Sequence, residues 1–329
     1  MKVLVTGASG FIGGHLVEAL IKQDTQVRIL SRPKSNLTHL QSLPIEVICG
    51  DLSDVESLRR AAEGVDIIYH CAALSSDWGS YSDFETANVQ GVHNLLDATR
   101  NSDTLKRFVH LSTTDVYGYP IQACDERYPI TDIGLPYNKT KGLGEKLVWD
   151  AHQQHGVPVT IIRPVSVYGP RGTAFVQIIG SLIDQGMMTV FNGGHTHAGL
   201  LYIDNAVEFI LRASLSERSL GQVYNLRDDF DINWRNYVDA LALKLHKRKP
   251  WLNIPTAAAL LAGSVVERMH SVLHLKSAPI LTRHAVLLMA REQGYFIDKA
   301  KRELDFKSRV GFDEGVDRSA YWFRHEMRH

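Results

Sequence analysis

Short apolar runs alternate with longer segments of helical periodicity along the first half of the chain. The first run is Val3–Val5, and after Gly7 an apolar stripe follows at helical spacing. Continuous apolar runs of this length are typical of buried strands, and their alternation with helices indicates a parallel sheet covered on both faces. We predict further strands at Val27–Leu30, Glu46–Cys49, Ile67–Cys71, Arg107–Leu111 and Val159–Ile162, and helices at Ala87–Arg100 and Leu143–His155.

The pattern loosens after Arg163-Pro164. The elements expected there are a helix at Ala174–Gln185, a strand at Leu200–Ile203, a helix capped by Asp204, a strand at Val223–Leu226 and mostly helical structure from Asn253. The fold class is therefore α/β, a Rossmann-type doubly wound parallel sheet with a smaller, mostly helical C-terminal substrate lobe. We expect residues 1–165, with a returning strand near 221–228, to form the dinucleotide-binding domain and 166–329 the partly interleaved lobe.

The turn between the first strand and the first helix predicts a dinucleotide site. Gly7 suits a positive φ, Gly10 allows a pyrophosphate close to the backbone, and Gly13 allows the helix to pack closely on the sheet. The helix N-terminus then offers N–H groups to the phosphates. The spacing is G-x-x-G-x-x-G rather than the standard G-x-G-x-x-G. Cofactor-binding candidates in this turn are Gly7, Ser9, Gly10, Phe11, Ile12 and Gly13.

Residues at the end of the second strand bear on the choice of cofactor. An acidic side chain there would bind the ribose 2′-hydroxyl and select NAD, but the positions hold Ser31 and Arg32. The hydroxyl of Ser31 and the guanidinium of Arg32, which can donate two hydrogen bonds at once, suit a 2′-phosphate. These residues therefore favour NADP(H) as the cofactor, with NAD(H) as the alternative. The alternative is that Arg32 and Lys34 belong to a solvated loop.

Two further strand ends supply cofactor-binding candidates. Asp51-Leu52 follows the third strand, where the carboxylate would accept a hydrogen bond from the adenine amino group or cap the next helix. Ala72-Ala73 follows the fourth strand, and small residues there would let the cofactor ribose lie against the backbone.

Composition narrows the function classes. The chain has 36 basic and 36 acidic residues, and this balance does not indicate the excess of positive charge that is typical of nucleic-acid-binding proteins. Cys49 and Cys71 fall in apolar runs and are expected to be small buried thiols, and neither cysteines nor histidines show metal-ligand spacing, so no metal site is predicted. No signal peptide is apparent and Ala257–Val266 is too short to span a bilayer, so we expect a cytoplasmic protein.

Tyr137 and Lys141 are the candidates for proton transfer. Four residues apart at the start of a helix, they share one face. A tyrosinate can take a proton from a carbinol, and a phenol can give one to a carbonyl. An ammonium beside it should lower the phenol pKa, and we assign this role to Lys141, with a possible contact to the nicotinamide ribose. Thr113, at the end of the fifth strand, would hydrogen-bond the substrate oxygen.

These residues occur within a longer series of motifs. The chain resembles the extended short-chain dehydrogenase/reductases, also called the NAD-dependent epimerase/dehydratase family, in Thr6–Gly13, Asn88–Gly91, Tyr137–Lys141, Arg163-Pro164 and Tyr168–Pro170. The resemblance implies that Thr113, Tyr137 and Lys141 form the catalytic triad. It also implies that Pro164 and Val167 lie beside the nicotinamide, and that the protein is a homodimer.

The branch within that family is indicated by further motifs. Sugar 4,6-dehydratases carry an Asp where this chain has Thr114, which argues against dehydration. The motifs at Asp77–Gly79, Val109–Gly118, Gly199–Asn205 and Pro279–Arg283 are similar to the 3β-hydroxysteroid dehydrogenase branch, which includes reductases of long β-keto acids. We name Asp77, Trp78, Thr114 and Arg171 as substrate candidates.

The expected function is interconversion of a secondary alcohol and a ketone on an apolar, sterol-like or β-keto acid-type small molecule. The alternatives are a nucleotide-sugar 4-epimerase with tightly held NAD and a non-catalytic NADP-sensing regulator. The apolar helices Ala257–Val266 and Ile280–Met289 would roof an apolar pocket, form core or a dimer interface, or rest on a membrane surface.

Overall fold

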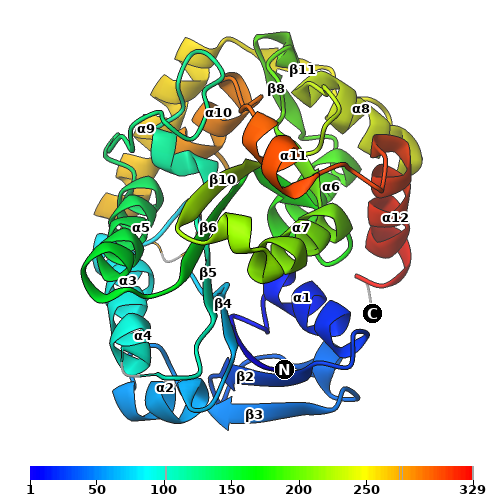
Figure 1. Cartoon of the computed structure of the whole chain (residues 1–329). Helices are drawn as coiled ribbons and strands as arrows, with labels where there is room; N and C mark the ends of the chain where they lie inside the picture. The colour runs from blue at the N-terminus through cyan, green and yellow to red at the C-terminus, as the bar shows by residue number, and fades with distance from the viewer. Residues whose placement is uncertain (101, 274, 276, 328–329) are drawn as a thin grey trace.

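A seven-stranded parallel sheet forms the centre of the molecule (Figure 1). The computed structural model describes residues 1–100, 102–273, 275 and 277–327. The sheet has the order β10-β6-β5-β4-β1-β2-β3. Its strands are β1 (Lys2–Thr6), β2 (Gln26–Ser31), β3 (Ile45–Cys49), β4 (Ile67–His70), β5 (Arg107–Leu111), β6 (Val159–Pro164) and β10 (Gln222–Leu226). Each predicted strand is confirmed to within two residues, including the one that returns to the sheet from the second half.

The sheet is doubly wound around β1. Val3 pairs in register with Val27 of β2 on one side and with Ile67 of β4 on the other. The chain first builds outward to β3 and then crosses to β4, so the strand order reverses between β1 and β4. In open sheets of this kind, ligands bind outside the carboxyl ends of the strands at this reversal.

Helices cover both faces because the central strands are apolar on both. Val3 and Val5 join the core beneath α1 (Phe11–Ile21) and α7 (Ile203–Leu215), whereas Leu4 faces the opposite layer. That layer contains α2 (Val55–Ala62), α4 (Gly91–Thr99) and α5 (Pro136–His155). A short helix, α3 (Tyr81–Glu85), and a π-helical turn at Thr86–Gln90 lead into α4, so the helix predicted over Ala87–Arg100 is regular only in its second part.

The C-terminal half adds a helical lobe with two small parallel sheets. These pair β7 (Ser166–Tyr168) with β9 (Leu200–Tyr202) and β8 (Thr189–Phe191) with β11 (Leu252–Ile254). The helices of the lobe are α6 (Ile179–Asp184), α8 (Trp234–Lys244), α9 (Thr256–Val272), α10 (Arg283–Ala290), α11 (Asp298–Leu304) and α12 (Phe312–His325). Phe191, Ala259 and Val286 form a separate small core where α9 and α10 pack over β8. The inward faces of the two apolar helices are therefore core.

Three local predictions are wrong. Cys49 is exposed, because β3 is the edge strand and lacks a second covering layer at that point. Asp204 lies in the first turn of α7 but does not cap it, since the chain enters the helix from β9 at Tyr202. Asp51 does not cap α2; the side chain of Asp54 accepts the N–H groups of Glu56 and Ser57. None of the helices in the described part of the chain combines the length and apolar character needed to cross a bilayer.

Candidate active site

The glycine turn forms a tight cradle between β1 and α1. Gly7 has φ +72°, and a Cβ on it would lie 2.6 Å from the backbone nitrogen of Ala72. A Cβ on Gly13 would collide with the Gly7 carbonyl. The N-cap residue of α1 is Gly10, so the helix has no side-chain cap, and its first turn holds no acidic residue. Its first N–H groups, including those of Phe11, Ile12 and Gly13, are therefore open to an anion, and the residues present fit a pyrophosphate.

The ends of β2 and β3 lie beside this cradle. Ser31 is buried and its hydroxyl donates to the Arg32 carbonyl at 3.4 Å, whereas the Arg32 side chain is exposed. Asp51 accepts hydrogen bonds from the backbone nitrogen and the hydroxyl of Ser53, both at 2.9 Å. Leu52 packs against the position of Gly91 at the start of α4.

The next strand ends complete the same edge. Ala72 follows β4 and its N–H donates to the Thr6 hydroxyl at 3.3 Å, with Ala73 directly after it. Pro164 is the last residue of β6, and Val167 is buried within β7. The fold therefore brings the cofactor candidates to one edge of the sheet, as parallel strands require. Their contacts with a cofactor remain predictions.

Tyr137 lies in the first turn of α5, facing the ends of β4 and β5. Burial raises its pKa to about 12, and the charge of Asp115 adds to the effect. Hydrogen bonds with the hydroxyls of Ser75 and Thr113 act in the opposite direction. Because donors stabilise a phenolate, these two hydroxyls and Tyr137 form a unit that can hold or release a proton.

Lys141 lies one helical turn after Tyr137, but its ammonium group points elsewhere. Its Nζ donates to the Leu111 carbonyl at 2.6 Å. Burial lowers its pKa to about 8, although the charge of Glu145 opposes the change. The expectation that Lys141 lowers the pKa of Tyr137 is wrong for this structure, because desolvation of the phenol dominates and the opposing hydrogen bonds come from Ser75 and Thr113.

A buried polar network connects α5 to the strands of the main sheet. The Ser112 hydroxyl donates to Glu145 at 2.5 Å, and the Arg163 guanidinium binds the same carboxylate through Nε at 3.0 Å. Arg163 also donates to the Tyr117 hydroxyl at 2.6 Å, which in turn donates to Asn225 at 2.6 Å. The network ties α5 to β5, β6 and β10, and so fixes the helix that carries Tyr137 and Lys141.

The C-terminal lobe contributes a histidine to the site. His284, the second residue of α10, stacks on Tyr137 with ring centroids 5.9 Å apart and an interplanar angle of 21°. Its Nε2 lies 3.1 Å from Oδ2 of Asp115. Burial alone would lower the pKa of His284, but the hydrogen bond to Asp115 and its charge raise it above the ordinary value.

The substrate candidates occupy different places. Asp77 accepts a 2.8 Å hydrogen bond from Thr282, which caps α10, and Trp78 meets His270 of α9 edge to face at 5.9 Å. Thr114 is buried beside Thr113 at the start of a 3-10 turn. Arg171 makes a two-pronged contact with Glu18 of α1, at 2.5 and 2.9 Å. Asp77 and Thr114 thus lie next to the Tyr137 centre, while Arg171 is held against α1.

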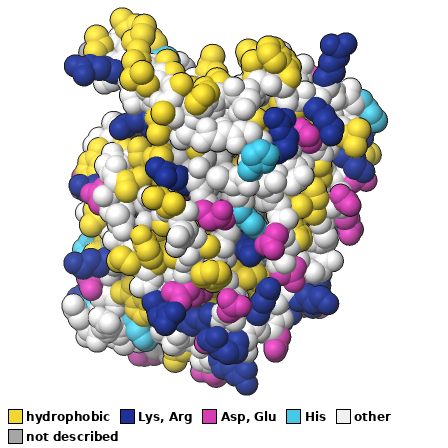
Figure 2. All heavy atoms as spheres, turned by 90° about the horizontal axis from the view of Figure 1, so that it is seen from above, with side chains coloured by type: hydrophobic (Ala, Val, Ile, Leu, Met, Phe, Trp, Pro, Cys, Tyr) yellow, Lys and Arg dark blue, Asp and Glu magenta, His cyan; other side chains and the backbone are white. Residues whose placement is uncertain are grey.

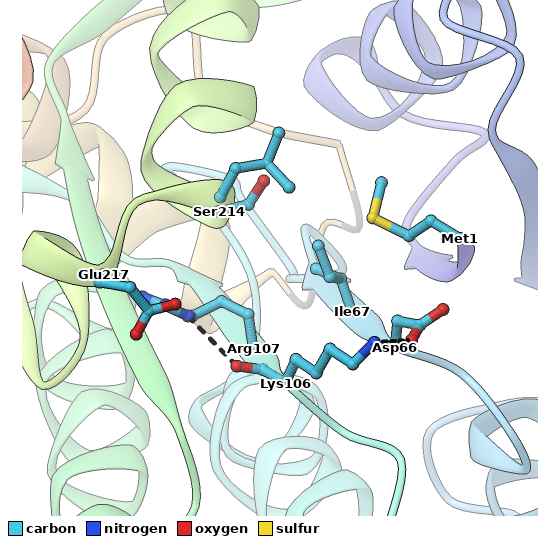
Figure 3. Close-up of a pocket in the computed structure, with 8 residues that line it drawn as sticks. Met1, Asp66, Ile67, Lys106, Arg107, Ser214 and Glu217 are labelled. Carbon is cyan, nitrogen blue, oxygen red and sulfur yellow. Dashed lines mark hydrogen bonds and ion pairs between the residues drawn. The ribbon is translucent and has the colours of Figure 1, made fainter.

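A cavity of about 330 Å³ lies at the opposite edge of the sheet (Figure 3). It is lined by residues at the amino ends of the strands, including Met1, Asp66, Lys106 and Arg107, with Ser214 from the last turn of α7 and Glu217 from the segment after that helix. It contains no predicted site residue. Because open parallel sheets bind ligands at the carboxyl ends of their strands, we do not assign the active site to this cavity.

Comparison with known proteins agrees with this geometry. The model of the NAD dependent epimerase/dehydratase family matches residues 3–226. The chain belongs to this family. The farnesyl dihydroquinoline-1-oxide ketoreductase of Stigmatella aurantiaca (in full, 4-hydroxy-2-methyl-3-oxo-4-farnesyl-3,4-dihydroquinoline-1-oxide ketoreductase) is 32% identical over 96% of this chain and 95% of its own. The 2-alkyl-3-oxoalkanoate reductase of Stenotrophomonas maltophilia is 28% identical over 97% and 98% of the two chains.

The relatives of this epimerase/dehydratase chain also include proteins named as sterol and 3β-hydroxysteroid dehydrogenases. Among solved structures, UDP-glucuronic acid 4-epimerase from Bacillus cereus, in complex with NAD, superposes with a TM-score of 0.78 at 24% identity. The match covers 98% of this chain and 99% of the epimerase, and it confirms the Rossmann-type fold. The protein is an NAD(P)-dependent enzyme of the extended short-chain dehydrogenase/reductase type.

Sequence reasoning missed three residues of this family member's site. Ser75 gave no signal, because a serine in a loop after a strand is common. Asp115 was noted only as part of a motif, and His284 directly follows the Pro279–Arg283 motif without being singled out. The distance of 169 residues between Asp115 and His284 along the chain explains why no local pattern joins them.

Proposed function

We propose that the protein is an NADP(H)-dependent ketoreductase that interconverts a ketone and a secondary alcohol on an apolar, β-keto acid-type or sterol-like substrate. The observation that carries the proposal is the Tyr137 phenol in hydrogen-bond contact with Ser75 and Thr113, beside the cofactor cradle. A phenol is protonated at neutral pH and can give its proton to a ketone oxygen, and the two neighbouring hydroxyls favour the phenolate that is left.

The residues then have distinct roles. Tyr137 gives the proton to the forming alkoxide in reduction and takes it back in oxidation. Thr113 and Ser75 position the substrate oxygen and stabilise the phenolate that remains. Lys141 supplies a buried positive charge one turn away and would hold the nicotinamide ribose. When bound, NADPH supplies the hydride, and Ser31 and Arg32 would hold its 2′-phosphate.

The polar contacts of the lobe favour an apolar substrate over a nucleotide sugar. A diphosphate needs cationic donors, and Arg171 and Arg235 are two arginines of the lobe that could supply them. Arg171 is paired with Glu18, and Arg235 donates to the Pro250 carbonyl at 2.6 Å and lies 3.5 Å from Asp239. The names of the two ketoreductase relatives also describe ketones that carry a farnesyl or alkyl chain.

The test measures cofactor consumption by protein that has been dialysed free of nucleotide, with a β-keto acid and with UDP-sugars as the substrates that are compared. We expect exchangeable NADPH binding and loss of NADPH absorbance with a 2-alkyl-3-oxoalkanoic acid, and no conversion of UDP-sugars. NAD that resists dialysis, together with epimerisation of a UDP-sugar, would refute the proposal in favour of an epimerase. Cofactor binding without turnover of any ketone would favour a sensor.

A further inference from the structure

Helix α9 presents an apolar face that the described part of the chain does not cover. Its buried residues are Ala259 and Gly263, which face α10. On the other side Leu261 is 69% exposed, Val265 51%, Met269 56% and Val272 70%. At spacings of four, four and three residues, these side chains form one stripe along about three turns of the helix.

Other exposed apolar side chains lie in the segments directly before and after α9. Trp251, just before β11, is 79% exposed, and Leu273, Leu275 and Ile280 are exposed after the helix. Figure 2 looks down on the molecule and shows hydrophobic side chains gathered at its upper left, on the side where Figure 1 places α9. Contiguous apolar surfaces of this kind mark contact with a membrane or another protein.

The charge of the segment distinguishes between these two partners. Although the whole chain is neutral, residues 245–291 contain one acidic residue, Glu267, which pairs with Arg283 at 2.8 Å. Against it stand seven cationic residues, namely Lys247, Arg248, Lys249, Arg268, Lys276, Arg283 and Arg291. Lys247 and Lys249 have acidic partners outside the segment, Asp184 and Asp239. Arg248 and Arg268 are exposed.

Arg268 lies at the border of the apolar stripe itself. It follows Leu261 by seven residues and Val265 by three, and it precedes Val272 by four, so it shares their side of α9. A lipid-facing helix combines an apolar face with flanking cations and an interfacial tryptophan in this way. A surface for a second copy of this neutral chain would not need the excess of positive charge.

We propose that the outer face of α9, with Arg268 at its border and the exposed Arg248 and Trp251 in the segment that precedes the helix, docks on an anionic lipid bilayer. The helix would lie in the interface without crossing it. The face also connects to the catalytic centre, since His270 contacts Trp78, and Arg283 and Thr282 hold α10 above Tyr137. Docking itself does not depend on the proposed substrate, but delivery of a lipophilic ketone from the bilayer would rest on it.

Vesicle flotation of the full-length protein tests the proposal. We expect flotation with vesicles of phosphatidylcholine and phosphatidylglycerol, and much less with phosphatidylcholine alone. Val265→Ser/Met269→Ser should weaken binding about tenfold or more, and Arg268→Gln about fivefold. Leu215→Ser/Leu243→Ser, which removes two exposed leucines from α7 and α8, should bind as the wild type does.

Activity on a water-soluble ketone separates docking from catalysis. The α9 variants should keep that activity and their melting temperature, because the changed side chains are exposed and outside the catalytic centre. Absence of flotation, or equal flotation of wild type and Val265→Ser/Met269→Ser, would overturn the proposal. So would a wild-type dimer that fails to float and becomes monomeric in that variant, since the face would then be a protein interface.

Discussion

The imidazole of His284 stacks on the phenol of Tyr137, with ring centroids 5.9 Å apart and planes inclined by 21°. His284 comes from the C-terminal lobe and Tyr137 from the Rossmann part of the chain. Asp115 binds the outer edge of the imidazole at 3.1 Å and also raises the pKa of Tyr137 through its charge. The lobe and Tyr137 are therefore coupled through one carboxylate.

His284 should make folding stability depend on pH. Its pKa is raised above 6.5 in the folded chain, so its contribution to stability is fully present below about pH 6.5 and is lost as the pH rises through the raised value. The difference in free energy of unfolding between wild type and His284→Gln should therefore be largest in mildly acidic buffer. Urea denaturation across the pH range measures it. His195→Gln, at an exposed position in the C-terminal half, is the control, and a difference independent of pH would contradict the coupling.

Tyr137→Phe should reduce turnover about 10²- to 10⁴-fold and leave cofactor binding near the wild-type value, because only the proton donor is removed. Steady-state kinetics and nucleotide titration measure the two effects separately. Tyr321→Phe, on the exposed side of α12, should leave both unchanged. Retention of most activity in Tyr137→Phe would mean that another group transfers the proton.

Asp115→Asn should shift the pH profile toward lower pH. The charge of Asp115 raises the pKa of Tyr137, so its removal lowers that pKa. Oxidation requires the tyrosinate, so as the pH increases its activity should begin to rise at a lower pH than in the wild type. Reduction requires the phenol, so as the pH increases its activity should begin to decline at a lower pH than in the wild type. Profiles of kcat/KM in both directions provide the measurement. Asp317→Asn, an exposed carboxylate on α12, serves as the control, and unchanged profiles in Asp115→Asn would count against the electrostatic coupling.

Arg32→Ala should weaken NADPH binding about 10- to 100-fold and leave NADH binding unchanged, because a hydrogen-bonded charge on the 2′-phosphate is lost. Fluorescence titration with each nucleotide tests this selectivity. Lys34→Ala in the same loop is the matched control and should have a smaller effect. An equal loss for both nucleotides would show that Arg32 supports the loop and does not select the cofactor.

Glu145→Gln should lower the free energy of unfolding by about 3–5 kcal/mol, because it leaves the Arg163 guanidinium buried without its carboxylate. Glu314→Gln removes the partner of Arg318 at the exposed surface of α12 and should cost about 0–1 kcal/mol. Urea unfolding of both variants gives the comparison. A small loss in Glu145→Gln would indicate that water or another group replaces the carboxylate.

The sequence predicted the sheet well because its evidence is local. Apolar runs mark β1, β4 and β5, and the glycine turn needs only neighbouring residues to define the cradle. The sequence failed where a neighbour in space decides the outcome. Cys49 lies in an apolar run but is exposed at the sheet edge, and the Lys141 ammonium turns to the Leu111 carbonyl.

By itself, the sequence determined the doubly wound α/β fold, the tight glycine turn and the placement of Tyr137 and Lys141 on one helical face. Only the tertiary structure decided that His284 and Asp115 meet at Tyr137, that Glu18 engages Arg171, and that the described part of the chain leaves the outer face of α9 uncovered. The physical reason is that periodicity and backbone conformation act over a few residues, whereas side-chain pairing, burial and the pKa shifts they cause depend on segments brought together only by folding.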